Sequence, residues 1–251
     1  MLVRTWLVLK IKSVWRWIGF SDKTLWDWLQ LLIIPVALGL AALWFADKNS
    51  KTEQALAEDA SQEAALLRYY DDISKLLIDY DLRNSDAGDE VRTIARIRTL
   101  SVLRRLNGVR KGYVIVFLYE SGLITASEPI LSLKNAYLRG MVLNFADLRG
   151  IDLHEVDLRN SDLTGTDFEG ADLSIVEFGG ANIQSVNFRR TNLTWTSLVD
   201  TLLVGSLLEN ANLTYANLSN ADLRLCHLEN TIIDNIVFNE ATIWPEGYSA
   251  P

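Results

Sequence analysis

The sequence is poor in the residues that most often carry chemistry or cross-links. Its 251 residues include one cysteine, two histidines, two methionines and four prolines. The single thiol, Cys226, excludes a disulfide framework within the chain, and we expect it to be a small buried side chain. His154 and His227 have no metal-ligand cluster, phosphate loop or Ser-His-Asp arrangement beside them in the sequence. The sequence therefore predicts a protein that is not an enzyme and has no cofactor, metal or small-molecule substrate.

Positive charge is concentrated at the start of the chain and scarce at its end. Residues 1–24 hold five Lys and Arg against one Asp, whereas residues 131–251 hold 7 basic against 16 acidic residues. The basic start favours contact with a membrane surface, and the acidic end argues against binding to nucleic-acid phosphates. We therefore expect membrane lipid, but no nucleic acid, among the partners.

The first 46 residues predict attachment to a membrane. Residues 1–24 mix basic, aromatic and aliphatic side chains, as a basic amphipathic segment in a membrane interface does. Residues 25–46 are apolar over a length that crosses a hydrocarbon core, which predicts a transmembrane helix. Three tryptophans flank this helix as a membrane anchor: Trp26, Trp28 and Trp44. The alternative is a signal peptide, but Trp44 and Phe45 stand where a cleavage site needs small residues. The flanking charges favour a cytoplasmic N-terminus.

Residues 47–128 predict an α-helical linker or stalk. The stretch 51–80 contains no Gly or Pro and is rich in Ala, Glu and Leu, which favours one long helix. Its apolar side chains recur every three or four residues, as in a helix that packs on another helix: Leu66, Tyr70, Ile73, Leu77 and Tyr80. A turn-like break near Gly88 precedes a second helix over 89–108, and a short third helix is expected over 111–121.

The second of these helices is strongly basic. Seven Lys and Arg fall between Arg92 and Lys111, with no acidic residue among them. Four of the seven are predicted to contact anionic lipid or an acidic partner: Arg92, Arg96, Arg104 and Arg105. The alternative is that the basic residues pair within the chain with the acid-rich stretch 53–90.

The strongest signal in the sequence is a period of five. Every position ending in 3 or 8 from Leu133 to Ile243 is Leu, Phe or Ile, which makes 23 consecutive centres in a chain that is 49% hydrophobic. Neither an α-helix nor a continuous strand has this period, so each repeat must be a short extended piece followed by a turn. The residue two positions before each centre is nearly always small and should share its inward face. The sequence thus predicts a packed solenoid without room for an internal ligand.

Several repeats resemble those of pentapeptide repeat proteins, among them ADLRG (Ala146–Gly150), ANLTY (Ala211–Tyr215) and ADLRL (Ala221–Leu225). The resemblance implies a mainly β fold, a right-handed quadrilateral β-helix with four repeats per coil. We expect it over residues 129–245, followed by a C-terminal tail at 246–251. Residues 20 apart should then be neighbours, so that Phe168 stacks on Phe188. The stretches 23–35, 95–112 and 117–124 also resemble membrane-anchored members from cyanobacteria. This second resemblance implies a single-pass protein of a thylakoid or bacterial plasma membrane.

Acidic residues precede seven successive centres and would wrap around the outside of the coil. They are Asp147, Asp152, Asp157, Asp162, Asp167, Asp172 and Glu177. Asp at such a position commonly accepts hydrogen bonds from the backbone of the turn. The alternative is an anionic surface that imitates DNA, as in family members that protect gyrase from quinolones. The protein would then be a regulator of a DNA-binding enzyme.

Large apolar side chains interrupt the polar outside of the coil. They are Ile175, Trp195, Leu202, Val204, Tyr215, Leu225 and Ile232. Exposed apolar groups on a polar solenoid predict a protein contact, although scattered surface hydrophobes are also normal. We therefore expect a non-catalytic, membrane-anchored scaffold or adaptor that docks on a membrane protein complex through the outer surface of its β-helix. The cyanobacterial resemblance makes photosynthetic complexes the natural partners.

Overall fold

The computed structural model describes residues 25–125 and 129–248, with side chains except those of residues 25–32 and 34. The chain divides into two units, residues 1–59 and 60–251. The predicted basic segment at 1–24 lies outside the described residues, as do the side chains of Trp26 and Trp28 and the last three residues of the predicted tail.

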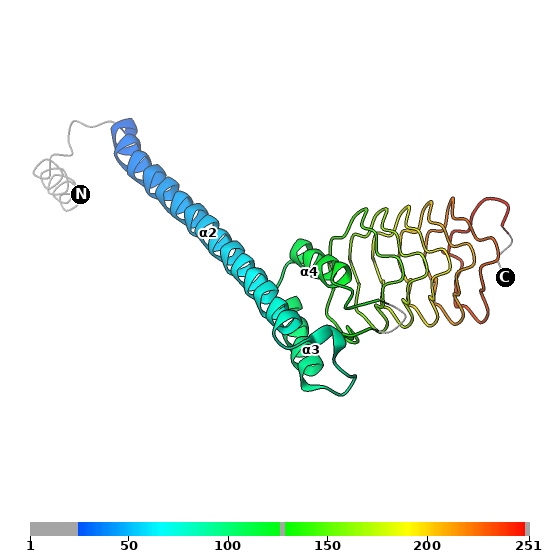
Figure 1. Ribbon diagram of the computed structural model, residues 1–251. Coiled ribbons are helices and arrows are strands. Elements are labelled where there is room, and N and C mark those ends of the chain that lie inside the picture. The colour runs from blue at the N-terminus through cyan, green and yellow to red at the C-terminus, as the bar shows by residue number, and fades with distance from the viewer. Residues whose placement is uncertain (1–24, 126–128, 249–251) are drawn as a thin grey trace, which may run out of the picture. The chain divides into compact units, whose positions relative to one another are not determined.

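Helix α2 (Leu25–Ile78) is a single helix of 54 residues (Figure 1). The predicted anchor at 25–46 and the predicted stalk helix at 51–80 thus belong to one continuous helix. Beyond Gly39 the helix contains neither Gly nor Pro, so nothing in the sequence interrupts it there. Among the residues whose side chains are described, no helix is both long and apolar enough to cross a membrane. The predicted transmembrane helix at 25–46 thus finds no support in these residues.

The end of α2 packs on two shorter helices, α3 (Glu90–Leu103) and α4 (Gly108–Glu120), after a short 3₁₀ helix, η1 (Leu82–Asn84). The side chains that α2 buries are Leu66, Tyr69, Ile73 and Leu76. The predicted seam is therefore wrong at Tyr80, and it omits Tyr69 and Leu76. Tyr70 and Leu77 are only partly buried, and Tyr80 is exposed beyond the end of the helix. Because apolar side chains stand at both 69 and 70, and at both 76 and 77, the spacing alone does not decide which faces the core.

Residues 131–243 form a four-sided coil joined by parallel β-bridges. Nearly all of these bridges link residues 20 apart, from Tyr137↔Asp157 to Asn217↔Val237, which confirms four five-residue repeats per coil. The last one, Asp222↔Ile243, spans 21 residues, so the final turn holds one extra residue. The bridges are isolated because each side of the coil is extended only briefly before the next corner.

The core of the coil consists of the centres and the small residues two positions before them. Every centre from Leu133 to Leu223 is buried. The rings of Phe168 and Phe188 stack with their centroids 5.9 Å apart, as predicted. Buried hydroxyls among the small residues donate to backbone carbonyls of the coil, for example Thr191 Oγ1 to Phe168 O at 2.8 Å. These bonds satisfy polar groups that have no access to water.

Helix α4 covers the N-terminal end of the coil (Figure 1). Lys111 is 4% exposed, and its Nζ donates to Arg139 O at 2.8 Å. Burial lowers the pKa of this amine, because a charge is costly to hold away from water. At the other end of the helix, Tyr119 OH donates to Arg149 O at 2.8 Å. Two side-chain hydrogen bonds therefore fasten α4 to the first coil.

Two glycines allow α4 to approach the coil closely. Gly108 O accepts from Val142 N at 3.0 Å, which extends the hydrogen bonding of the coil onto the helix. A Cβ added to Gly108 would lie 2.0 Å from Gly140 O, and one added to Gly112 would lie 2.3 Å from Val142 O. Neither position has space for a side chain.

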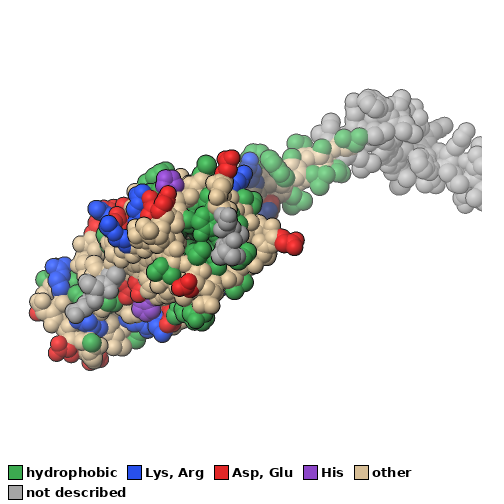
Figure 2. Space-filling view, turned by 90° about the vertical axis from the view of Figure 1, so that its right-hand side faces the viewer, with side chains coloured by type: hydrophobic (Ala, Val, Ile, Leu, Met, Phe, Trp, Pro, Cys, Tyr) green, Lys and Arg blue, Asp and Glu red, His purple; other side chains and the backbone are tan. Residues whose placement is uncertain are grey.

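The C-terminal end of the coil is less covered. Phe238 and Ile243, two centres of the last coil, are 38% and 45% exposed. Trp244 packs edge-on against Phe238, with centroids 5.6 Å apart, and stacks on Tyr248 at 5.4 Å. Figure 2 looks toward this end and shows hydrophobic side chains gathered among charged ones.

Candidate interaction surface

Each corner of the coil contains a residue in the left-handed backbone conformation. From Asn135 to Asn235, every fifth residue has a positive φ, between 55° and 72°. Gly, Asn and Asp tolerate this conformation best and occupy most of the corners. Ile175, Trp195 and Tyr215 break the rule at three successive levels of one corner. An L side chain pays about 1–2 kcal/mol for this conformation, and a β-branched one such as Ile175 is a genuine outlier.

These three residues form an exposed strip, which we call the apolar ladder. Ile175, Trp195 and Tyr215 are 48%, 60% and 44% exposed. The Trp195 and Tyr215 rings stack with centroids 4.2 Å apart and planes 19° apart. Backbone bonds hold the levels together, with Ile175 N donating to Thr194 O at 2.9 Å and Trp195 N to Thr214 O at 3.0 Å. The ladder is therefore a rigid apolar surface in register with the coil.

Polar groups border the apolar ladder. Thr194 Oγ1 donates to Asn192 Oδ1 at 2.9 Å, and Thr214 Oγ1 donates to Asn212 Oδ1 at 2.6 Å. One level earlier, a serine and an aspartate make the equivalent bond at 2.7 Å. An ordered polar margin around a stacked aromatic pair has the general composition of a protein interface, with a hydrophobic centre and a polar rim.

Three of the other predicted partner-binding residues, Leu202, Val204 and Leu225, lie away from the apolar ladder. Leu202 and Leu225 are 46% and 73% exposed, whereas Val204 is half-buried. Leu202 bridges Asn182 and residue 222, which places it on a different side of the coil. Ile232 is exposed one coil beyond Asn212. Ile232 therefore lies on the same side of the coil as the ladder, and the other three predicted residues do not join it.

Phe145 is an exposed corner residue that the sequence reasoning missed. Its side chain is 79% exposed, and its φ is 58°. The ring occupies the space over Gly165, where an added Cβ would lie 2.5 Å from the ring carbons. The signal that could have found it is the pairing of a large residue with a glycine 20 positions later.

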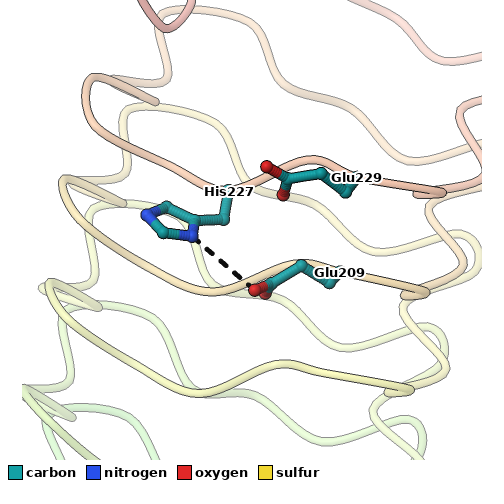
Figure 3. Close-up of side chains that lie close together, drawn as sticks. All are labelled: Glu209, His227 and Glu229. Atoms are coloured by element: carbon teal, nitrogen blue, oxygen red, sulfur yellow. Dashed lines mark ion pairs between the residues drawn. The ribbon is translucent and has the colours of Figure 1, made fainter.

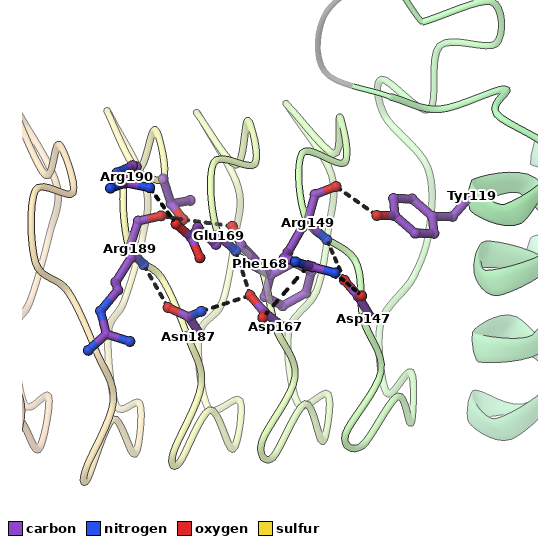
Figure 4. Close-up of polar contacts among 10 residues, drawn as sticks. Tyr119, Asp147, Arg149, Asp167, Phe168, Glu169, Asn187, Arg189 and Arg190 are labelled. Atoms are coloured by element: carbon purple, nitrogen blue, oxygen red, sulfur yellow. Dashed lines mark hydrogen bonds and ion pairs between the residues drawn. The ribbon is translucent and has the colours of Figure 1, made fainter.

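The aspartates around the coil serve the turns (Figure 4). Asp147 Oδ1 accepts from Arg149 N at 3.3 Å and from Arg149 Nε at 2.8 Å. The Arg149 guanidinium holds the pKa of Asp147 below its usual range. Asp167 Oδ1 accepts from Glu169 N at 2.9 Å and from Asn187 Nδ2 on the next coil at 2.9 Å. These carboxylates are engaged locally, as predicted for Asp before a turn.

The coil brings together three residues that the sequence reasoning did not connect, Glu209, His227 and Glu229 (Figure 3). One possible ligand atom from each lies within 4.8 Å of the others. His227 Nδ1 is 3.6 Å from Glu209 Oε1, and Arg189 donates to the same oxygen at 2.6 Å. The three residues are a candidate cation site, although Arg189 already balances one carboxylate, and the absence of a metal stays a prediction. These residues are close because positions about 20 apart in the sequence lie on adjacent coils.

The four arginines predicted to contact lipid or an acidic partner have different roles. Arg92 and Arg96 donate to backbone carbonyls of the chain, the second to Lys134 O at 2.8 Å. Their guanidinium groups are therefore used to hold the fold. Arg104 and Arg105 are exposed.

Pairing with the acid-rich stretch, the alternative for this basic segment, also occurs. Arg98 Nη1 lies 3.0 Å from Asp72 Oδ1, and Arg110 Nε lies 3.1 Å from Glu63 Oε2. Both carboxylates belong to α2, so these ion pairs join the basic helices to the long helix.

The repeat region matches a known family. Residues 132–170, 151–190 and 191–230 match the family model "Pentapeptide repeats", with eight copies. Over these residues the chain is similar to that family. Together with the parallel bridges between residues 20 apart, this match supports the expected β-helix.

Several solved structures are similar to the chain. Rfr23, a pentapeptide repeat protein from the cyanobacterium Cyanothece 51142, is 23% identical over 41% of this chain and 90% of that chain, with a TM-score of 0.22. A pentapeptide repeat protein from the Arabidopsis thaliana thylakoid lumen is 24% identical over 34% and 70%, with a TM-score of 0.18. QnrB1, a plasmid-mediated fluoroquinolone resistance protein, is 17% identical over 43% and 66%, with a TM-score of 0.20. Among curated proteins, none matches the chain.

Proposed function

We propose that the protein is a non-catalytic scaffold that docks on another protein through the apolar ladder of its pentapeptide repeats. One observation carries the proposal: three successive levels of one corner hold exposed Ile175, Trp195 and Tyr215 where the backbone favours Gly or Asn. Backbone strain that persists at an exposed position motivates a hypothesis of function there. If only the stability of the fold mattered, Gly or Asn would be the better residue at these three positions.

The rigidity of the apolar ladder suits it to docking. The stacked rings of Trp195 and Tyr215 are held by the coil, so little side-chain freedom remains to be lost on binding. Three levels about 4.8 Å apart make a strip on the order of 10 Å long. A partner that covers it should present an apolar strip of similar length, such as one face of a helix.

The test uses the full chain with a photo-crosslinking residue in place of Trp195, expressed in the native host. Asn210 is the matched control, because it is also an exposed left-handed corner of the coil. We expect a discrete protein adduct from position 195 and none from position 210. Ile175→Asn and Tyr215→Ser, in a folded chain checked by circular dichroism, should reduce that adduct. Identical products from both positions, or ladder variants that keep the full yield, would contradict docking through the ladder.

Attachment to a membrane stays a prediction from the sequence of residues 1–46. A membrane-bound scaffold would place its partner among membrane complexes, of which photosynthetic complexes were expected. Alkaline carbonate washing of isolated membranes tests this: the full chain should remain in the pellet, and its release into the supernatant would contradict an inserted anchor.

We do not extend the proposal to imitation of DNA. The aspartates that would stand in for phosphates bond to their own turns, and Asp157 and Asp222 pair with Arg159 and Arg224 at 2.7 and 2.6 Å. Such pairing reduces the anionic field that a DNA mimic needs.

A further inference from the structure

A basic groove lies between α2 and α3, away from the pentapeptide repeats. Its volume is about 380 Å³. Arg68 and Asp72 line it from α2, Arg98 and Ser101 line it from α3, and Arg105 lines it from the turn that follows α3. A volume of this size lies at the lower end of the range for small-molecule sites, about 300–1,000 Å³.

The charges in the groove are unbalanced. Asp72 is the one carboxylate among its lining residues, and it forms an ion pair with Arg98, with Nη1 3.0 Å from Oδ1. The side chains of Arg68 and Arg105 are exposed and make no hydrogen bond or ion pair within the described part of the chain. Three guanidinium groups against one carboxylate leave the groove with a net charge of +2. Its charge therefore matches a dianion.

The rest of the lining is small or apolar. Two alanines of α2 line the groove with small side chains. Ile97, which is 57% exposed, and the buried Val102 line it as well. The Tyr69 hydroxyl is not available to a ligand as a free donor, because it already bonds Thr99 Oγ1 at 2.9 Å. Ser101 offers a hydroxyl at the edge of the groove. The surroundings suit a ligand whose anionic head is joined to a small apolar body.

We propose that this groove binds a phosphate monoester, with Arg68 and Arg105 holding the phosphoryl oxygens and Ile97 contacting the apolar body. A phosphate monoester carries a charge of about −1.5 to −2 at pH 7, and planar guanidinium groups bind its oxygens through paired hydrogen bonds. The same chemistry occurs in soluble organic phosphates and in the headgroup of phosphatidic acid. Of the arginines predicted from sequence to meet an anion, only Arg105 belongs to this groove.

The test uses the full chain in detergent at low ionic strength, with phenyl phosphate as the soluble probe and isothermal calorimetry as the readout. We expect one site per chain, and a Kd raised about tenfold by Arg68→Ala and again by Arg105→Ala, the size of one charge-assisted hydrogen bond each. Arg104→Ala is the matched control, because Arg104 is exposed beside Arg105 but does not line the groove. It should leave the Kd unchanged.

A second variant should change the Kd in the opposite direction. Asp72→Asn releases Arg98 and removes the carboxylate, so we expect it to lower the Kd severalfold. Phenol, which has the same ring without the charge, should not bind. Lowering the pH to about 5 removes part of the charge of the probe and should weaken binding.

Vesicles separate the two sources of the phosphate. Binding to phenyl phosphate that depends on Arg68 and Arg105 supports a soluble ligand. Binding only to phosphatidylcholine vesicles that contain phosphatidic acid, lost in the same variants, supports a lipid headgroup. The proposal is overturned if neither probe binds, if Arg104→Ala weakens binding as much as Arg105→Ala, or if Asp72→Asn has no effect. Circular dichroism of each variant shows whether the fold is kept.

Discussion

Replacing Gly112 with alanine should destabilise the protein, although alanine is the better helix former. In an exposed helix, Gly→Ala gains about 0.5–1 kcal/mol. Gly112 lies within α4, but an added Cβ would stand 2.3 Å from Val142 O and 3.3 Å from Leu143 Cδ1. A backbone oxygen of the coil cannot turn away, so the helix would have to retreat by roughly 1 Å to restore a normal contact.

The magnitude follows from what that retreat disrupts. The bonds from Lys111 Nζ to Arg139 O and from Tyr119 OH to Arg149 O, both 2.8 Å, would lengthen beyond hydrogen-bonding distance. Overpacking costs about 1–3 kcal/mol, and each lost bond about 1 kcal/mol. After subtraction of the gain in helix propensity, we expect a net loss of about 2–4 kcal/mol.

Native-state hydrogen exchange is the suitable assay, because repeat solenoids often do not unfold in two states. The Val142 amide, which donates to Gly108 O at 3.0 Å, reports directly on the contact between α4 and the coil. Its protection should fall by more than tenfold in Gly112→Ala. Gly88→Ala is the control, because an added Cβ there meets nothing within 4 Å; it should be neutral or slightly stabilising. Equal protection in the two variants would refute the steric argument.

Three further predictions concern single side chains. Ile175→Asn should raise the free energy of unfolding by about 1 kcal/mol, because Asn tolerates a φ of 60° better than Ile; a lower melting temperature would contradict this. Burial raises the pKa of the Cys226 thiol to about 11, so a thiol reagent at pH 8 should label it only after denaturation, and rapid labelling of the native protein would count against its burial. The lowered pKa of Lys111 means that the unfolded state binds more protons than the folded state between that pKa and the ordinary value of 10.5. Stability should therefore rise with pH through this window, and the rise should be absent in Lys111→Met when denaturation is followed at several pH values.

The sequence predicted the coil well because its signal is local and repeated. An apolar centre every fifth residue with a small residue two positions earlier leaves only one inward face for each repeat. The 20-residue register then followed from four repeats per coil, and the stack of Phe168 on Phe188 confirms it. The turn role of aspartates such as Asp167 was predictable for the same reason, since the bond it makes reaches only two residues along the chain.

The helical part was harder to predict. Tyr69 and Tyr70 are both apolar enough to face a core, and only the position of α3, with Thr99 bonding the Tyr69 hydroxyl, decides between them. The roles of the basic residues likewise depend on which neighbours the fold supplies. Arg96 donates a hydrogen bond to a backbone carbonyl 38 residues away, whereas Arg105 lines the groove.

The sequence by itself determined the solenoid and its inward and outward positions, because a strict period specifies packing that repeats from one coil to the next, whereas the four repeats in each coil came from the resemblance to pentapeptide repeat proteins. Only the tertiary structure decided what stands beside what across coils and helices. It stacked Trp195 on Tyr215 and seated α4 on the coil through Gly108 and Gly112. It also left Arg68 facing a groove without a counter-ion of its own. These relations depend on distances between residues far apart in the chain, and periodicity alone does not encode them.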